Sequence, residues 1–285
     1  LLMYLAAAGV GRIGIVDFDV VDESNLQRQI IHRQDSIGKS KIQSAYKTIL
    51  DINPFCKVDK YEQILRKDNA LEIIEPYDLV CDCTDNFPSR YLINDACVIL
   101  NKPNIYGSIE KFKGQVTVFN FDSNSPNLRD LIPEPPPNNL LPSCSEAGVI
   151  GVLPGLIGLI QATEVIKIVT SVGKILNGRL LTFDALSMRF REITIKKREY
   201  KSELKPKKLI EYEGFCFQSN SNKSEVKNIS ANDFKLILAQ KRDDIFLIDV
   251  RDSSEHKLNS INGSILIPLK NFEDHLMLEK IKKES

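Results

Sequence analysis

The sequence predicts an α/β protein with a doubly wound sheet, followed by a second, smaller α/β domain. Short β-rich runs alternate with helical segments over residues 1–195, which is the pattern of a sheet built from strand–helix units. The run DLVCDC at residues 78–83 is mostly apolar, as expected of a strand buried on both faces of a parallel sheet. With 285 residues, the chain can form one large and one small domain.

The elements follow in order along the chain. An apolar helix over residues 1–8 ends at Gly9 and Gly11, and a β-rich run ends at Asp17. Residues 36–51 have apolar side chains close to helical spacing and stop at an Asn-Pro break. Further helices are expected at residues 90–100 and 148–169, further strands at residues 114–121, 179–184 and 191–195, and a loop with five prolines at residues 132–143.

Composition excludes several classes of protein. Lys and Arg number 38 and Asp and Glu number 38, so no net charge attracts nucleic acid or an anionic membrane. The longest apolar run, residues 149–160, contains Pro154 and three glycines and is shorter than the ~20 residues of a bilayer span, so we expect a buried helix and no membrane. Six cysteines without a Cys-x-x-Cys pair indicate a reducing compartment.

The chain divides into three parts. Residues 1–195 form the large domain, residues 196–228 form a polar linker that we expect to be a solvated tether, and residues 229–285 begin the second domain. Because the chain starts at Leu1 instead of Met and ends on a polar helix with no strand after it, we expect both domains to be truncated in a piece of a longer protein.

Acidic residues follow two strands of the predicted sheet. In nucleotide-binding α/β sheets, an acidic residue at the end of the second strand meets the ribose hydroxyls, and Asp17 has this position. Asp85 and Asn86 follow the strand at residues 78–83, where open sheets bind ligands, so both are candidate nucleotide-binding residues, and Asp85 is a hard oxygen ligand that suits Mg²⁺. The alternatives are a solvated strand end for Asp17 and a helix cap for Asp85 and Asn86, and a cap is compatible with the metal role.

A dense polar run lies between these two strands. Its amides are hydrogen-bond donors, its cation neutralises the charge of a triphosphate, and Lys41 adds a second cation. The run consists of Ser24, Asn25, Leu26, Gln27 and Arg28.

Together these residues resemble the ubiquitin-activating-enzyme-like adenylyltransferases, specifically the bacterial and plastid-type molybdopterin-synthase adenylyltransferases and their thiamine-pathway relatives. The resemblance is dense and covers about residues 1–195. The matching runs are AGVG (8–11), DFDVVDESNLQRQ (17–29), GKSK (38–41), INP (52–54), DCTDN (82–86), GQVTVF (114–119), PEPPP (133–137) and SCSEAGVIGVLPGLIG (143–158).

The resemblance implies a Rossmann-like, ATP-binding domain that forms a homodimer. It implies that Asp17 binds the ribose, that Asn25, Arg28 and Lys41 contact the phosphates, and that Asp85 lies by Mg²⁺ and the α-phosphate. The glycine-rich loop of the family and an arginine donated across the dimer fall before Leu1, so we expect this piece to bind nucleotide poorly.

The chain departs from the resembled family at the zinc site. Many members have two Cys-x-x-Cys pairs there. At the place of the first pair this chain reads PNLRD (residues 126–130), with Asn127 and Asp130 instead of thiolates, and no pair follows Ile195. We therefore predict no zinc.

Cys144 is the candidate nucleophile. It closes the proline-rich loop and precedes a helix, with Ser143 and Glu146 in capping-box spacing. A thiol in the first turn of a helix has its pKa lowered by the helix dipole. In the resembled family, the cysteine of this loop takes up the activated carrier or sulfur in some members. We expect the other cysteines to be small buried apolar groups: Cys56, Cys81, Cys83, Cys97 and Cys216.

The segment at residues 245–269 resembles the first half of a rhodanese domain. It contains a DVR-x-x-x-E-[YH] pattern and a G-x-x-x-x-P turn at residues 263–268. The residues of the pattern are Asp249, Arg251, Glu255 and His256. The resemblance implies a persulfide sulfur donor, whose cysteine lies beyond the reach of this chain.

These observations predict a nucleotidyltransferase that uses ATP and Mg²⁺ to adenylate the C-terminal glycine of a ubiquitin-like sulfur carrier, before thiocarboxylate formation in molybdopterin, thiamine or thiolated-tRNA synthesis. The alternatives are an NAD-type dinucleotide-binding oxidoreductase and a non-catalytic module that binds the carrier. The polar run with Lys41 suits a triphosphate and has no evident use for a nicotinamide. The 26 Lys against 12 Arg are typical of AT-rich genomes, and we expect a cytoplasmic protein or one of the plastid stroma.

Overall fold

The computed structural model describes residues 1–134, 148–198, 206, 208–212, 229, 234–235 and 247–268. Its contacts divide the chain into two compact units, Leu1–Asn220 and Ser221–Ser285. The division falls inside the segment at residues 196–228 that the sequence analysis assigns to a linker.

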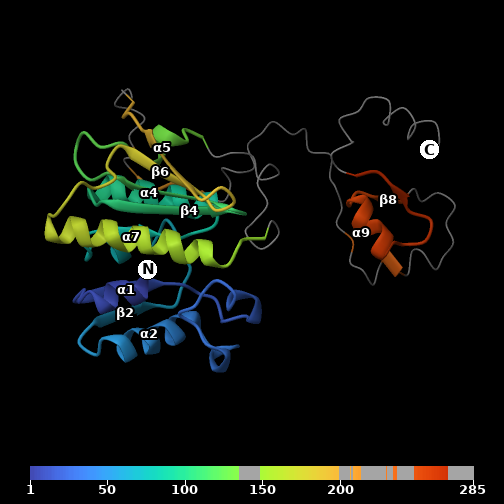
Figure 1. The fold of residues 1–285 in the computed structure, drawn as a ribbon, viewed down its shortest axis with the longest axis horizontal. Coiled ribbons are helices and arrows are strands. Elements are labelled where there is room, and N and C mark those ends of the chain that lie inside the picture. Colours follow the sequence, from blue (N-terminus) through green and yellow to red (C-terminus); the bar gives the residue numbers. More distant parts are fainter. Residues whose placement is uncertain are drawn as a thin grey trace. The chain divides into compact units, whose positions relative to one another are not determined.

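The first unit is a mixed α/β structure (Figure 1). Its helices are α1 (Leu2–Ala7), α2 (Lys41–Ile52), α3 (Ala70–Ile74), α4 (Phe87–Leu100), α5 (Leu128–Leu131) and α7 (Val152–Thr170), with 3₁₀ turns at η1 (Glu23–Asn25) and η2 (Gln34–Ser36). Its strands are β1 (Arg12–Val16), β2 (Lys57–Tyr61), β3 (Val80–Asp82), β4 (Asn104–Glu110), β5 (Lys113–Phe119), β6 (Arg179–Asp184) and β7 (Arg189–Thr194).

One layer contains a two-stranded parallel sheet, in which β1 pairs with β2. Helix α2 lies between the two strands in sequence, as parallel strands require a crossover connection. α2 begins at Lys41, five residues later than predicted, because Gly38 adopts φ +78° and the Ser40 hydroxyl accepts the Gln43 N–H at 3.3 Å as the helix cap. Of the apolar residues of α2 at helical spacing, Ile42, Ala45 and Ile49 are buried and Leu50 is half-buried.

The second layer contains a five-stranded sheet in the order β3-β4-β5-β6-β7. β3 and β4 are parallel, whereas the later neighbours are antiparallel. For β4 and β5 the reason is connection length: only Lys111 and Phe112 separate them, and so short a loop joins neighbouring strands as a hairpin. The predicted α/β class is therefore confirmed, but the strands form two sheets, a parallel pair β1–β2 and a mixed five-stranded sheet whose parallel pair is β3–β4.

Helix α7 packs along the five-stranded sheet on one side and contacts α1 on the other (Figure 1). Leu153, Ile157 and Val165 are buried in a core that also includes Ile13 of β1 and Val116 of β5. A Cβ at Gly114 would lie 2.4 Å from Ile157, so this glycine permits the close approach of helix and sheet.

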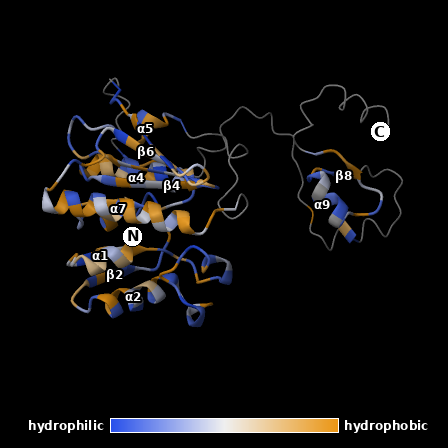
Figure 2. Cartoon of the chain, viewed as in Figure 1, coloured by the Kyte–Doolittle hydropathy of each residue, from blue (hydrophilic) through white to orange (hydrophobic). Residues whose placement is uncertain are grey.

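By length and composition alone, α7 is apolar enough to cross a membrane, contrary to the expectation from the run at residues 149–160 (Figure 2). The helix is longer than that run because it continues to Thr170. Its packing identifies it as a helix of the protein core, since Gln161 and Glu164 are buried and bond to the chain around them. Val152 and Val169, at its ends, are exposed.

Part of the predicted solvated linker is packed on the first unit. Tyr212 is 6% exposed, and Leu209 and Ile210 pack against the same apolar cluster under α4. The Tyr212 hydroxyl donates to Asp95 Oδ2 at 2.7 Å, and Arg129 donates to both oxygens of Asp95 at 2.7 and 2.9 Å. The bond between Tyr212 and Asp95 could not be predicted from the sequence, because the polar composition around Tyr212 is typical of a solvated tether.

In the second unit, β8 (Ile248–Asp249) pairs in parallel with β9 (Ile265–Leu266), and α9 (Ser253–Leu258) lies between them in sequence. Asp252 and Glu255 form a capping box at the start of α9. This strand–helix–strand order agrees with a second α/β domain.

Candidate functional site

Residues 17–28, here the β1 turn, carry the first group of candidate residues. Asp17 directly follows β1, and its Oδ1 accepts the Asp19 N–H at 2.9 Å. Lys41 Nζ donates to Asp19 Oδ2 at 2.7 Å; the lysine side chain is 13% exposed and the aspartate 48%. Asp17, Asp19 and Lys41 therefore meet where β1 ends, and Asp19 is a member of the site that the sequence analysis did not single out.

The middle of the β1 turn is held by its own side chains. Asp22 Oδ1 accepts the Ser24 N–H at 2.8 Å, and the Asp22 N–H donates to Asn25 Oδ1 at 3.2 Å, which forms a capping box. Hydrogen bonds from Ser24 lower the pKa of Asp22. Arg28 Nη1 donates to the Ser24 carbonyl at 3.0 Å, which leaves most of the guanidinium donors of Arg28 able to bind an anion.

The β1 turn also contacts α7. A Cβ at Gly151, which precedes α7, would lie 2.2 Å from the Gln27 carbonyl oxygen and 2.5 Å from Gln27 Oε1. Gln27 is exposed and Leu26 is half-buried. The glycine is thus required where the polar run meets the beginning of α7.

His32 lies beneath this group, and the sequence analysis did not identify it. It is buried, and its Nδ1 is 2.9 Å from the Ser44 hydroxyl. Burial lowers the pKa of His32, the charge of Lys41 lowers it further, and Asp17 opposes both effects. His32 is therefore a neutral neighbour of the two predicted site residues at neutral pH.

Residues 82–86, here the β3 turn, carry the second group. Asp85 is exposed, and its carboxylate has one hydrogen bond, from Asn86 Nδ2 at 3.5 Å. Asn86 Oδ1 accepts the Ser89 N–H at 2.9 Å and caps α4. The predicted cap is confirmed for Asn86, whereas Asp85 remains available for a ligand.

The β3 turn stands on buried groups. Asp82 is fully buried, and its Oδ1 accepts the Thr84 N–H at 2.9 Å and the Thr84 hydroxyl at 2.7 Å. Burial raises the pKa of Asp82, against the charge of Arg90 and the bonds from Thr84. Gln161 Nε2 of α7 donates to the Asp82 and Ile105 carbonyls at 2.9 and 3.0 Å. α7 therefore contacts the β1 turn at its start and the end of β3 at its centre.

Asp17, Asn25 and Arg28 lie in the β1 turn, and Lys41, at the start of α2, is joined to this turn by its bond to Asp19. Asp85 lies in a separate turn. Both turns follow the carboxyl ends of parallel strands, where open α/β sheets bind ligands. Within the described residues, no hydrogen bond or ion pair links the two turns directly. The β1 turn thus supplies cations, and the β3 turn supplies an exposed carboxylate.

Of the six cysteines, Cys56 and Cys97 are buried as predicted, and Cys81 is half-buried. Cys83 is exposed as a residue, because β3 ends at Asp82 and Cys83 already belongs to the turn. Its thiol nevertheless points inward: it donates to Oε1 of the buried Gln161 at 3.6 Å, and burial raises its pKa to about 11. Cys144 and Cys216 lie outside the described residues, as do Ser143 and Glu146.

The donor set of the β3 turn fits Mg²⁺ bound together with a nucleotide. The described residues contain no cluster of three or more His, Cys, Asp or Glu side chains that could enclose a metal. Mg²⁺ commonly takes one or two carboxylates and completes its shell with phosphates and water, which the exposed Asp85 allows.

Asn127 and Asp130, at the place of the family's first zinc pair, have a structural role. Asn127 Oδ1 accepts the Arg129 N–H at 2.9 Å, and Asp130 Oδ2 accepts the Asn127 N–H at 2.8 Å, which caps α5. Asp130 Oδ1 also accepts the Arg198 N–H at 2.7 Å. The absence of zinc remains a prediction.

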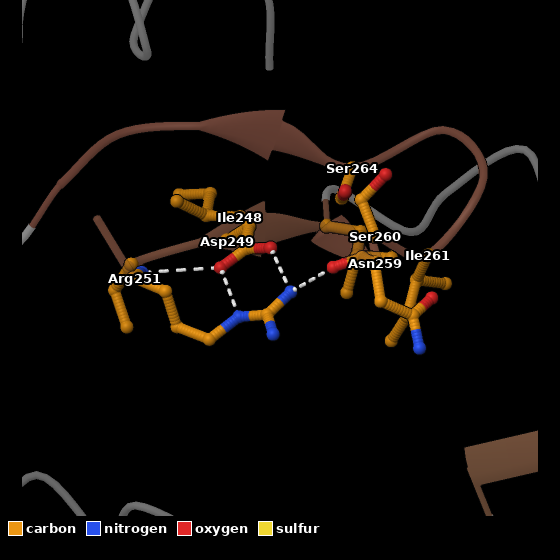
Figure 3. Close-up of a pocket in the computed structure, with 9 residues that line it drawn as sticks. Ile248, Asp249, Arg251, Asn259, Ser260, Ile261 and Ser264 are labelled. Carbon is orange, nitrogen blue, oxygen red and sulfur yellow. Dashed lines mark hydrogen bonds and ion pairs between the residues drawn. The ribbon is translucent and has the colours of Figure 1, made fainter. Parts of the chain in front are cut away.

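The second unit contains a cavity of about 390 Å³ beside the rhodanese-like pattern (Figure 3). Asp249 accepts hydrogen bonds from Arg251 Nε at 3.0 Å and Nη2 at 2.7 Å, and Arg251 Nη2 also donates to the Asn259 carbonyl at 2.7 Å. These bonds from Arg251 lower the pKa of Asp249 to about 2. Asp249 and Arg251 therefore use their charges to hold the loop around β8.

Solved structures share this fold. The crystal structure of E. coli MccB with AMPCPP and MccA superposes with a TM-score of 0.62, at 16% identity, over 72% of this chain and 62% of that one. At this identity the similarity establishes the fold alone.

Curated relatives align with most of the chain. The probable adenylyltransferase/sulfurtransferase MoeZ of Mycobacterium tuberculosis is 46% identical over 94% of this chain and 69% of its own length. The adenylyltransferase and sulfurtransferase MOCS3 of Arabidopsis thaliana is 43% identical over 96% of this chain, which spans 62% of that protein. The sulfur carrier protein adenylyltransferase of Thermus thermophilus is 45% identical over 75% of this chain and 82% of its own length.

The family itself is identified by a match over the first unit. The model of the ThiF family matches residues 1–204, which include both turns and all seven strands of that unit. With the relatives aligned over nearly the whole chain, this match shows that the chain belongs to the ThiF family.

Proposed function

We infer that this chain is an adenylyltransferase that uses ATP to activate the C-terminal glycine of a ubiquitin-like sulfur carrier protein. The names of the relatives support this activity: three independent similarities are to adenylyltransferases, one of them a sulfur carrier protein adenylyltransferase. The single structural observation that carries the proposal is the exposed Asp85 at the end of β3, in a turn that is anchored by the buried side chains of Asp82 and Arg90.

The residues of the two turns have different roles in the reaction. Asp17 binds the ribose hydroxyls, and Asn25 and Arg28 donate to the phosphates. Lys41 gives up part of its bond to Asp19 and neutralises the charge that develops as the carrier carboxylate attacks the α-phosphate and pyrophosphate leaves.

Asp85, in the other turn, would lie by the α-phosphate and act on it through a bound cation, because a bare carboxylate repels a phosphate. Mg²⁺, when bound through Asp85, would supply further charge neutralisation between the phosphates. The product is an acyl adenylate of the carrier, whose AMP is a good leaving group for a later attack by sulfur.

The sulfur step is assigned to Cys144 and to a persulfide donor. Two relatives are named sulfurtransferases as well as adenylyltransferases, and their alignments extend over 94% and 96% of this chain. The rhodanese-like pattern around Asp249 and Arg251 then belongs to the domain that delivers the persulfide, with the boundary between domains in residues 196–228.

The protein acts as a homodimer in the cytoplasm or the plastid stroma, in molybdopterin, thiamine or thiolated-tRNA synthesis. The reducing compartment follows from the cysteine pattern, and the dimer from the family resemblance. Light scattering of the full-length protein at micromolar concentration tests the dimer, and a monomer would contradict it.

Pyrophosphate exchange with the full-length protein tests the activity. We expect incorporation of labelled pyrophosphate into ATP that requires Mg²⁺ and a carrier with its C-terminal glycine. An NAD-type oxidoreductase would give no exchange and would bind NAD; a non-catalytic module would bind the carrier without exchange. Either result would contradict the proposal, and a carrier without its terminal glycine is the matched control.

A further inference from the structure

We propose that Asp82 and Thr84 are positioning residues that fix the direction of Asp85. The inference rests on the proposed function, because it concerns the carboxylate to which that function assigns the metal and the α-phosphate. Neither residue belongs to the set predicted from the sequence.

Thr84 is the residue directly before Asp85, and every polar group that it has is bonded. Its N–H and its hydroxyl both donate to Asp82 Oδ1, at 2.9 and 2.7 Å. Its carbonyl accepts from Arg90 Nη2 at 3.0 Å and from Arg90 Nε at 3.3 Å. The backbone that leads into Asp85 is therefore held from both sides.

The two groups that hold Thr84 are themselves fixed. Arg90 is 6% exposed, donates to the Tyr106 hydroxyl at 3.4 Å, and lies over the rings of Phe87 and Tyr106 at 5.3 and 5.5 Å. The Asp82 carbonyl accepts from Gln161 of α7. Strand β4 and helices α4 and α7 thus converge on one turn.

Stability alone does not account for a carboxylate at position 82. Asp82 is fully buried, and its Oδ2 has no hydrogen-bond partner among the described residues. A buried charge costs free energy compared with an apolar side chain of similar volume unless it is fully paired, and an unpaired buried oxygen adds to that cost. A carboxylate in this place is explained by the geometry it imposes on Thr84, since one oxygen accepts two bonds and the charge balances Arg90.

The consequence is a fixed carboxylate at an exposed position. Among the described residues, the 3.5 Å bond from Asn86 is the only hydrogen bond to the Asp85 carboxylate, so the direction of Asp85 depends on the backbone of Thr84. Displacements of about 1 Å at a reacting centre cost up to about 10²-fold in rate. Loosening Thr84 should therefore weaken the metal–phosphate contact of Asp85 while the fold persists.

The test compares Thr84→Val with Thr84→Ser in the full-length protein. Valine has the shape of threonine without the hydroxyl, and serine keeps the hydroxyl that Asp82 accepts. Three quantities are measured: the dissociation constant of MgATP by calorimetry, kcat and the half-saturating Mg²⁺ concentration in pyrophosphate exchange, and the melting temperature. Thr163→Val, on the exposed face of α7, is the control.

We expect Thr84→Val to lower kcat about tenfold and to raise the half-saturating Mg²⁺ concentration, with a weaker MgATP complex, and Thr84→Ser to restore all three values. Asp82→Ala, which removes the acceptor of both Thr84 bonds, should show the same change in Mg²⁺ dependence. Wild-type values for Thr84→Val, or equal losses in both Thr84 variants, would overturn the inference.

Asp85→Ala, measured beside these variants, separates the two proposals. If it abolishes exchange while Thr84→Val has no effect, the proposed function stands and the positioning role is wrong. If the wild-type protein shows no exchange, the proposed function is wrong, and the MgATP dissociation constants of the two Thr84 variants still decide the positioning role.

Discussion

The β1 turn and the β3 turn both follow parallel strands, but they are built in opposite ways. The β1 turn is held by side chains on its own surface, and its one ion pair joins Lys41 to an aspartate that is 48% exposed. The β3 turn is held by Asp82 and Arg90, which are almost completely buried. In the β1 turn, Arg28 and Lys41 can exchange their present hydrogen bonds for bonds to an anion. The β3 turn, by contrast, keeps the carboxylate of Asp85 in place.

This difference suggests that the β1 turn neutralises charge and that the β3 turn sets geometry. Asp19 is half exposed, so water can replace Lys41 at its carboxylate when the lysine turns to a phosphate. Breaking the buried contacts of the β3 turn costs more, because each partner would be left unsatisfied. The comparison predicts that changes in the β3 turn affect catalysis and geometry together, and that changes in the β1 turn affect charge neutralisation alone.

The largest effect is expected for Asp85→Ala. It should abolish carrier adenylation and leave the melting temperature unchanged, because Asp85 is exposed and has one weak bond to lose. Pyrophosphate exchange and thermal unfolding measure the two quantities. Asp51→Ala, at an exposed position of α2, is the matched control. Unimpaired exchange in Asp85→Ala would remove the β3 turn from the mechanism.

Cys144→Ser should block the sulfur step and spare adenylation, because adenylation needs only the carboxylate, ATP and metal. Cys144 should also react faster with a thiol-directed probe than Cys97, since burial raises the pKa of the Cys97 thiol. Thiocarboxylate formation is followed by mass spectrometry of the carrier. Formation at the normal rate in the variant would mean that sulfur passes directly from the donor to the adenylate.

Arg28→Ala and Lys41→Ala test the other turn. Each removes one positive charge from a phosphate site and should lower kcat/KM for pyrophosphate exchange by roughly 10² to 10³. Lys47→Ala, at an exposed position of the same helix as Lys41, should retain activity. Losses below about threefold in both variants would make Arg28 and Lys41 ordinary surface residues.

Tyr212→Phe should destabilise the first unit without changing adenylation. The variant keeps the ring and removes the hydroxyl that donates to the buried Asp95, at a cost of about 1–3 kcal/mol. The melting temperature should fall by several degrees, while Tyr4→Phe, at an exposed position, should leave it unchanged. Equal melting temperatures for both variants would mean that the segment at residues 208–212 contributes no stability.

The last prediction concerns zinc, which should be absent from the protein. Elemental analysis of the purified full-length protein should find none in stoichiometric amount, because Asn127 and Asp130 supply no thiolate. One zinc per chain would show a site that these residues do not explain.

Features that depend on local pattern could be predicted from the sequence. The apolar spacing of α2 and α7, the cap at Asn86 and the position of Asp17 after β1 each follow from a few neighbouring residues. Strand ends were less accurate: β3 stops at Asp82, which leaves Cys83 exposed.

Features that depend on long-range contacts could not be predicted. Asp82 is read as part of a strand in sequence, and only the fold brings Arg90 and Gln161 to the turn that it supports. Tyr212 meets Asp95 across 117 positions of sequence, inside a segment whose composition is that of a tether. In both cases a buried polar residue takes its role from partners that the local pattern does not reveal.

The central claim is that the residues of the two turns together catalyse the formation of an acyl adenylate on the carrier. The most direct measurement is mass spectrometry of a single-turnover mixture of the full-length protein, MgATP and a carrier ending in glycine. The account predicts an adenylated carrier and released pyrophosphate with the wild-type protein, and neither product with Asp85→Ala. An unmodified carrier with the wild-type protein, in a mixture where both substrates are bound, would contradict it.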